Sequence, residues 1–257
     1  MRFLQSLAIA FSMYSKIPMP KVEWNQKNMK YTLCFFPLVG VVIGTFIWVI
    51  GNWLLEEKVS QLFFAVSMTL VPIIISGGIH MDGFLDTVDA LSSYGEKEKK
   101  LEILKDPHAG AFAILGSSIY FLWSIGIWSE AYIRNLGKTT MLLIACSFVL
   151  SRALSGLSIV SFRLAKNSGL AAAFQDSAQR KKVGIIMIGY IIIMGAIMLW
   201  INIRLGLIAI CCGALAFGYH RYISYEKFGG ITGDLAGYFL QICELLIVSG
   251  MVLGVCL

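Results

Sequence analysis

Seven long apolar runs constrain the fold of this chain more than any other feature. They lie at about residues 33–54, 60–79, 109–130, 139–160, 183–202, 205–220 and 236–257. A helix needs roughly 20 mainly apolar residues to cross a ~30 Å hydrocarbon layer, and a soluble core could not bury a chain that is 58% hydrophobic and 14% charged. We therefore expect an all-α, polytopic integral membrane protein with about seven transmembrane helices, residues 1–257 forming one membrane domain.

The first thirteen residues are also apolar and have the look of a signal peptide. The run is short, however, no convincing cleavage site follows it, and Lys16, Pro18 and Pro20 end it. An amphipathic helix on or in the membrane surface is the better interpretation. The fifth and sixth runs are separated only by residues 202–204, which predicts a tight helical hairpin.

Lysine and arginine are distributed unevenly between the two sides of the predicted bundle. With the N-terminus inside, the inner segments 1–32, 80–108, 161–182 and 221–235 hold sixteen of these residues and the outer segments hold four. Because cytoplasmic loops of membrane proteins are enriched in basic residues, this asymmetry places the N-terminus inside and the C-terminus outside. It also explains the net charge of +6 without nucleic acid as a partner.

An acidic segment follows the second apolar run on the predicted inner side. Asp82, Asp86 and Asp89 are spaced at i, i+4 and i+7, which places three carboxylates on one helix face. No basic residue lies among them at helical spacing, and hard oxygen ligands suit Mg²⁺ or Mn²⁺. A metal site is the favoured interpretation, and a solvated acidic face is the alternative. His80 is as consistent with a structural cap of the preceding glycine turn as with a catalytic role.

Two further polar residues lie at or within predicted spans. Asp106 precedes Pro107, so it either caps the third span or takes part in a ligand or phosphate site. Arg152 lies inside the fourth span. It can bind a phosphate or pair with Asp234 or Glu244.

The glycine-rich loop before the last span is a candidate phosphate site. Gly230 and Gly233 allow backbone N–H groups to approach an anion at a helix N-terminus. Gly233 and Gly237 also fit a helix-packing pattern of small residues. Asp234 begins the same helix, and Glu244 lies ~15 Å further along it, so Glu244 is either functional or paired with Arg152.

These segments together resemble a known family. The matching stretches are YSKIPMP, FFPLVGVVIG, GGIHMDGFLDTVDALSS with EKEKKLEILKDPHAGAFAILG, Ser151-Arg152-Ala153, and GGITGDLAGYFLQICELL. They occur in order over nearly the whole chain and resemble the cobalamin synthase (adenosylcobinamide-GDP ribazoletransferase) family.

The resemblance implies a multi-pass enzyme of a bacterial or archaeal cytoplasmic membrane, acting at the last stage of coenzyme B₁₂ assembly. It implies transfer between adenosylcobinamide-GDP and α-ribazole or its 5′-phosphate, with release of GMP, a need for Mg²⁺ and an active site facing the cytoplasm. Asp82, Asp86 and Asp89 would then bind metal, and Asp89 or His80 would take a proton. Asp106, Arg152, Asp234, Glu244, Gly230 and Gly233 would bind substrate. A homo-oligomer is compatible with the sequence.

Two other functions were weighed against this one. A CDP-alcohol phosphotransferase or an Asp-rich prenyltransferase would carry paired acidic motifs that the chain lacks. A cation transporter would spread its acids through the spans, whereas these acids gather at one membrane face. Both alternatives are therefore disfavoured.

Overall fold

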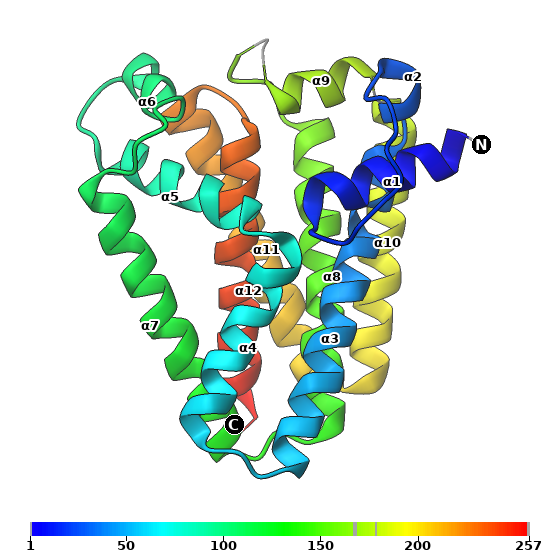
Figure 1. Cartoon of the computed structure of the whole chain (residues 1–257), viewed down its shortest axis with the longest axis vertical. Helices are drawn as coiled ribbons and strands as arrows, with labels where there is room; N and C mark the ends of the chain where they lie inside the picture. Colours follow the sequence, from blue (N-terminus) through cyan, green and yellow to red (C-terminus); the bar gives the residue numbers. More distant parts are fainter. Residues whose placement is uncertain (1, 167–168, 178, 256–257) are drawn as a thin grey trace.

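The computed structural model describes residues 2–166, 169–177 and 179–255, and these residues form helices joined by short loops (Figure 1). The helices are α1 (Arg2–Tyr14), α2 (Gln26–Met29), the 3₁₀ turn η1 (Thr32–Phe35), α3 (Phe36–Glu56), α4 (Gln61–Ser76), α5 (Ile79–Ser92), α6 (Lys97–Ile103), α7 (Ala111–Ile133), α8 (Lys138–Ser161), α9 (Leu170–Ser177), α10 (Arg180–Ile201), α11 (Ile203–Phe228) and α12 (Gly233–Gly254). The only β feature in the described ranges is a bridge between Leu164 and Ile231.

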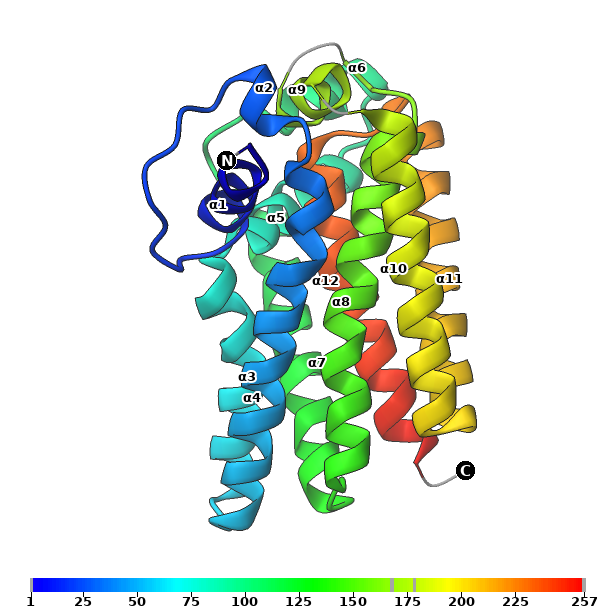
Figure 2. The same cartoon turned by 90° about the vertical axis from the view of Figure 1, so that its right-hand side faces the viewer.

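The helices that run along the long axis of the molecule are α3, α4, α7, α8, α10, α11 and α12 (Figures 1 and 2). Among the described residues, six helical segments are long and apolar enough to cross a membrane, and the pair α4–α5 makes a seventh candidate. The prediction of a polytopic all-α membrane protein is thereby confirmed. Helix α1 lies at one end of the bundle and α12 finishes at the other (Figure 1).

Helices α8 and α12 form the interior of the bundle. In the apolar window of α8, 89% of residues are buried, and in that of α12, 78% are. The neighbouring helix α10 has only 17% of its window buried, so most of its apolar surface faces outward. Figure 2 shows α8 between α3, α10 and α12. Apolar surface on the outer helices suits contact with lipid.

The predicted hairpin between the fifth and sixth spans is present. Asn202 alone separates α10 from α11, and its side chain accepts a 3.0 Å hydrogen bond from the Leu205 N–H. An Asn side chain at this position satisfies one of the free N–H groups at a helix start. The sixth span was predicted too short, because α11 continues to Phe228. Residues 256 and 257 of the seventh predicted span lie outside the described residues.

A sharp bend at the Gly77-Gly78 turn ends the second span. Helix α4 ends at Ser76, and Gly77 and Gly78 follow with φ of 67° and 79°. These left-handed conformations favour glycine and terminate a helix. Helix α5 then runs at 99° to α4, so it lies across the end of the bundle instead of continuing the span (Figure 1).

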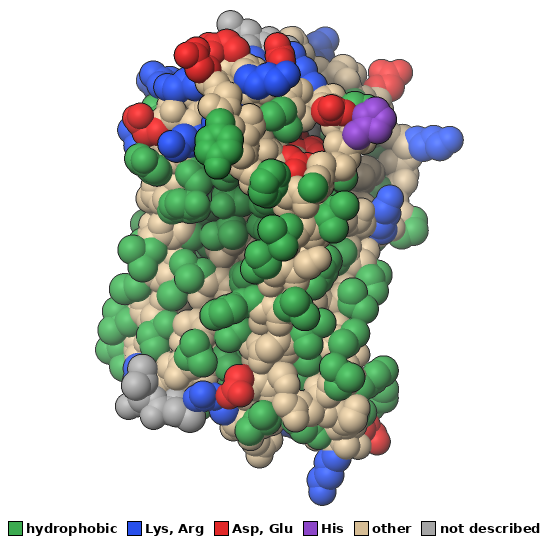
Figure 3. All heavy atoms as spheres, turned by 90° about the vertical axis from the view of Figure 1, so that its left-hand side faces the viewer, with side chains coloured by type: hydrophobic (Ala, Val, Ile, Leu, Met, Phe, Trp, Pro, Cys, Tyr) green, Lys and Arg blue, Asp and Glu red, His purple; other side chains and the backbone are tan. Residues whose placement is uncertain are grey.

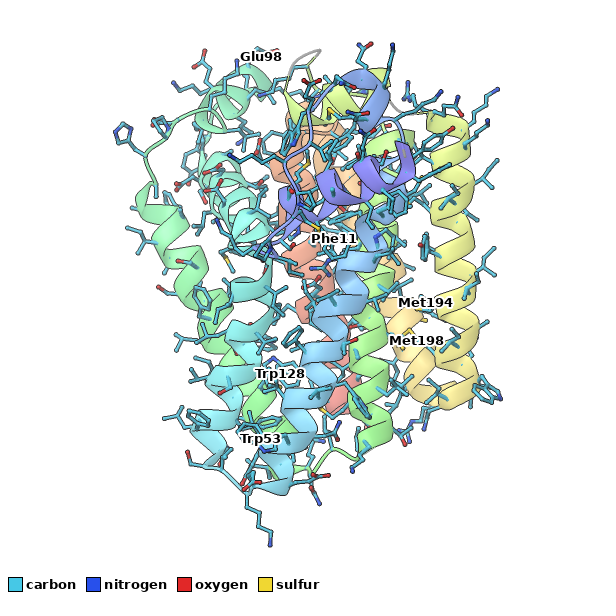
Figure 4. All side chains as sticks on the ribbon, turned by 45° about the vertical axis from the view of Figure 1, so that its right-hand side comes forward. Phe11, Trp53, Glu98, Trp128, Met194 and Met198 are labelled. Carbon is cyan, nitrogen blue, oxygen red and sulfur yellow. The ribbon has the colours of Figure 1, made fainter. Side chains whose placement is uncertain are left out.

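Helix α1 lies across the same end of the bundle as α5. Ile9 and Phe11 belong to the main apolar core, and Phe11 points from α1 toward the bundle (Figure 4). Phe3 and Leu4 are exposed. A helix buried on one side and apolar at its free end fits the expected amphipathic segment at a membrane surface.

Basic side chains gather at the end of the bundle that carries α1, α5, α6 and α9. Figure 3 shows most of the Lys and Arg side chains of one face there, with a belt of hydrophobic side chains below and a few charges at the far end. We call the end of the bundle that carries α1, α5, α6 and α9 the basic end. The sixteen basic residues of the predicted inner segments belong to it.

Candidate functional site

The crossing of α5 and α12 creates the site at the basic end. A Cβ on Gly83 would lie 2.7 Å from the carbonyl oxygen of Asp234, and a Cβ on Gly237 would lie 3.1 Å from that of His80. Both distances are too short for an ordinary side-chain contact, so the two glycines permit the backbones to touch. This contact brings the first turn of α12 beside the first turns of α5. Asp82 and Asp234 consequently reach one cavity.

That cavity has a volume of about 410 Å³. We call it the acidic cavity. Its wall comes from α1, α5, the segment around α9 and the start of α12. The lining residues with polar side chains are Tyr14, His80, Asp82, Lys166, Thr232 and Asp234. Its size is within the range of small-molecule sites.

The carboxylates near this cavity repel one another. Burial, together with the negative charges of Asp82, Asp234 and Asp89, raises the pKa of Asp86 to about 6. Asp82 is exposed and Asp86 is half-buried. The predicted acidic face therefore exists on α5, and Asp234 of α12 adds a fourth carboxylate to its field.

Asp89 is held by the helix that follows. Its Oδ2 accepts a 2.5 Å hydrogen bond from the Gly110 N–H, and its Oδ1 accepts a 2.8 Å bond from the Ala113 N–H. These are N–H groups at the start of α7 that have no partner within the helix. Asp89 thus caps α7 across the fold, and it does not line the acidic cavity.

His80 is the second residue of α5 and is buried, although it lines the acidic cavity. Its ring lies 5.9 Å from that of Tyr14 and 5.7 Å from that of Phe36, centroid to centroid. Burial and the positive charge of Arg152 lower the pKa of His80 to about 3, so its imidazole is neutral. Its Nε2 has no hydrogen-bond partner among the described residues.

Arg152 and Glu244 lie deeper in the bundle and pair with each other. The Arg152 Nη1 donates a 2.6 Å hydrogen bond to Glu244 Oε1, and both side chains are buried. Neither residue lines the acidic cavity. Of the two alternatives that the sequence left open for Arg152, the ion pair is the one present.

The comparison with known proteins agrees with the resemblance seen in the sequence. Residues 6–252 match the family model described as cobalamin-5-phosphate synthase. The chain belongs to the cobalamin-5-phosphate synthase family.

Two similar relatives cover nearly the whole chain. A Lachnoclostridium phytofermentans protein named adenosylcobinamide-GDP ribazoletransferase is 48% identical over 96% of this chain and 92% of its own length. A Clostridium perfringens protein of the same name is 32% identical over 94% of this chain and 95% of its own length. No solved structure matches. The prediction of a transferase of this family is confirmed.

The glycine loop before α12 packs against the segment that follows α8. The Gly230 N–H donates a 2.7 Å hydrogen bond to the Ser224 carbonyl, and the Ile231 N–H donates a 2.8 Å bond to the Arg163 carbonyl. A Cβ on Gly230 would lie 2.4 Å from the Leu164 carbonyl carbon. Gly230 therefore holds two chain segments together, whereas Gly233 lines the acidic cavity.

Asp106 does not cap the third span, and that alternative is wrong. Helix α7 begins at Ala111, and Asp89 provides the side-chain cap. Asp106 is exposed, and its Oδ1 accepts a 3.0 Å hydrogen bond from the His108 N–H. Its ligand role stays a prediction.

Three polar residues of the cavity wall, Tyr14, Lys166 and Thr232, were not predicted as site residues. Tyr14 ends α1, and its place in the family segment YSKIPMP was the available signal. Lys166 was assigned mainly to membrane orientation, although it lines the acidic cavity and its charge acts on Asp234. A lysine in a basic loop gives no sequence signal that separates these two roles.

Protein side chains alone do not form a complete metal shell here. No group of three or more His, Cys, Asp or Glu residues in the described part of the chain could hold a metal ion. Mg²⁺ usually takes one or two carboxylates and completes its shell with water and substrate phosphates. Asp82 and Asp234 line the acidic cavity and fit that mode, and Asp86 lies beside them without lining it; their mutual repulsion favours a cation here.

Proposed function

We propose that this chain joins adenosylcobinamide-GDP to α-ribazole, or to α-ribazole 5′-phosphate, and releases GMP. The name shared by the relatives supports this reaction. Within this chain, the observation that best supports the reaction is the α5–α12 crossing. It brings Asp82 and Asp234 to one cavity with Lys166. A phosphate-bearing substrate needs positive charge near its phosphate oxygens. Carboxylates can supply it by binding a metal ion, and a lysine can supply it directly.

The transfer exchanges one P–O bond for another. An oxygen of the ribazole forms a bond to the phosphorus attached to cobinamide, the bond from that phosphorus to GMP breaks, and the ribazole hydroxyl loses its proton. Such reactions depend mainly on positioning and on neutralising charge. Lys166 would meet phosphate oxygens in the acidic cavity, because its ammonium is the basic group in the cavity wall among the described residues.

We infer that Mg²⁺ is bound by one or two carboxylates of the set Asp82, Asp86 and Asp234, with substrate and water completing its shell. When bound, the ion would neutralise charge on the phosphate oxygens and on the leaving GMP. Asp89 was expected in this set, but its engagement with α7 favours Asp234 in its place.

His80 is the favoured proton acceptor. It lines the acidic cavity with an unpaired Nε2, whereas both oxygens of Asp89 accept bonds from α7. The neutral imidazole is the form able to accept a proton, and a phosphate anion in the same cavity would raise the pKa of His80.

The acidic cavity would face the cytoplasm. It opens at the basic end, and basic segments are retained on the cytoplasmic side. Single cysteines at Lys105 and at Lys58, in a cysteine-free background, would test this with a membrane-impermeant thiol reagent. In intact cells the Lys58→Cys variant should react and the Lys105→Cys variant should not; the reverse pattern would overturn the orientation.

The reaction is tested with membranes that contain the protein, supplied with adenosylcobinamide-GDP, α-ribazole and Mg²⁺. We expect adenosylcobalamin and GMP in equal amounts, and neither product from membranes with the Asp82→Ala variant at the same protein level. A folded wild-type protein that forms no cobalamin from α-ribazole or its phosphate would refute the proposal.

A further inference from the structure

A small recess adjoins the inner end of the acidic cavity. It has a volume of about 30 Å³ and shares Tyr14, His80, Gly233 and Gly237 with the wall of the cavity. Its remaining wall includes Ser155, on the interior helix α8. The recess therefore extends from the cavity toward the centre of the bundle.

Three polar atoms in this wall have no partner. The Tyr14 hydroxyl, the His80 Nε2 and the Ser155 hydroxyl are buried and make no hydrogen bond within the described residues. They come from three separate helices, α1, α5 and α8. Buried polar groups are nearly always hydrogen-bonded in folded proteins, so three such atoms around one small space indicate a polar ligand.

The chemistry of the wall limits what this ligand can be. Two hydroxyls and an imidazole can donate and accept hydrogen bonds, whereas the Lys166 ammonium that would match a phosphate lies in the wall of the acidic cavity and not in this recess. The aromatic rings of Phe36 and Phe174 form much of the rest. The volume has room for about two water-sized groups, so a single hydroxyl of a larger molecule fits.

We propose that this recess binds a hydroxyl group of the ribazole substrate through Tyr14, His80 and Ser155. This inference rests on the proposed function, because the ribazole is the acceptor in that reaction. Phosphate groups would lie just outside the recess, near Asp82, Lys166 and Asp234, so the hydroxyl bound by His80 is the one that attacks phosphorus and gives its proton to Nε2. The recess would then bind an uncharged hydroxyl, and the acidic cavity would bind the charged phosphate groups.

The proposal is tested by measuring KM separately for α-ribazole and for adenosylcobinamide-GDP. Tyr14→Phe and Ser155→Ala each remove one hydroxyl and keep the shape of the wall. We expect each to raise KM for α-ribazole roughly 2- to 10-fold, the loss typical of one uncharged hydrogen bond. The KM for adenosylcobinamide-GDP should be unchanged. Ser155→Val, which fills the recess, should raise KM for α-ribazole further.

Ser147→Ala is the matched control. Ser147 is also buried on α8, but its hydroxyl donates to the Ile144 carbonyl, so its loss should leave both KM values unchanged. Thermal unfolding in detergent would show that each variant is folded. Titration of α-ribazole alone onto the purified protein should give weaker binding by Tyr14→Phe and Ser155→Ala.

The outcomes separate the two proposals. If the wild type makes no cobalamin, the proposed function fails. If the wild type is active but folded Tyr14→Phe and Ser155→Ala variants keep the wild-type KM for α-ribazole, the recess proposal alone is refuted. A rise only in the KM for adenosylcobinamide-GDP would also refute it, because the hydroxyl would then belong to the other substrate.

Discussion

Arg152 on α8 and Glu244 on α12 join the two interior helices of the bundle through a buried ion pair. The same carboxylate oxygen, Glu244 Oε1, also accepts a 3.0 Å hydrogen bond from the Ser151 hydroxyl. The Arg152 Nη1 additionally donates a 2.9 Å bond to the Phe148 carbonyl. Each charge is thus matched by its partner and by a further polar contact, although Arg152 Nε has no partner among the described residues.

The first prediction concerns this pair. Replacing Glu244 with leucine leaves the Arg152 charge buried and unpaired, which typically costs about 3–5 kcal/mol. The Glu244→Leu variant should therefore unfold at a clearly lower temperature in detergent. The double variant Arg152→Met/Glu244→Leu removes both charges and should recover most of the loss. Equal destabilisation of the single and double variants would show that the pair itself is not the cause.

The second prediction separates the two roles considered for Asp89. Because Asp89 caps α7, the Asp89→Ala change should lower the free energy of unfolding by about 1–2 kcal/mol. Asp82→Ala should leave it nearly unchanged, since Asp82 is exposed, and should remove turnover. Chemical denaturation and product assays on both variants make the comparison. An Asp89→Ala protein with wild-type stability would contradict the capping role.

These two sites show what could be read from the sequence and what could not. The spacing of Asp82, Asp86 and Asp89 gave the correct helix and the correct end of the bundle, because both depend on local periodicity and on nearby charge. The contact between Asp89 and the start of α7 depends on the bend between α4 and α5. This is a tertiary relationship that leaves no signal in the sequence. For the same reason Asp106 looked like the cap.

The position of Asp234 was predictable only in part. Its place at the start of the last span was correct, but its approach to Asp82 depends on the α5–α12 crossing. Of the two glycines that make this contact, Gly237 fitted an ordinary packing pattern in the sequence, and Gly83 carried no signal of its own. Spacing along one helix predicts a face, but it does not predict which face of another helix lies opposite.

The third prediction concerns pH and Mg²⁺. The pKa of Asp86 is about 6 in the folded protein, above the value of about 3.9 expected when unfolded. Asp86 therefore favours folding below pH 4, and this contribution is lost as pH rises to about 6. With a chelator present, the Tm should fall between pH 5 and pH 7, and Asp86→Asn should reduce that fall.

Mg²⁺ should act in the opposite direction. The ion binds the ionised carboxylates of the folded state, so it should raise the Tm more at pH 7 than at pH 5. Asp82→Asn and Asp234→Asn should each weaken this shift. A wild-type Tm that is indifferent to Mg²⁺, both alone and with substrate, would remove these residues as ligands.

The fourth prediction tests the helix crossing itself. An alanine Cβ at Gly83 would lie 2.7 Å from the Asp234 carbonyl oxygen and 2.9 Å from its Cα, so α5 and α12 must move apart. Overpacking of this kind typically costs about 1–3 kcal/mol. Because the same contact places Asp82 beside Asp234, activity should fall well beyond what the stability loss explains.

Gly126→Ala is the control for this change. Gly126 lies within α7, and a Cβ there meets nothing within 4 Å, so alanine should be neutral or slightly stabilising. Turnover and Tm measured on both variants distinguish a specific contact from a general effect of glycine replacement. A Gly83→Ala protein with full turnover would mean that catalysis does not depend on the close approach of α5 to α12. Asp82 and Asp234 would then have to act independently.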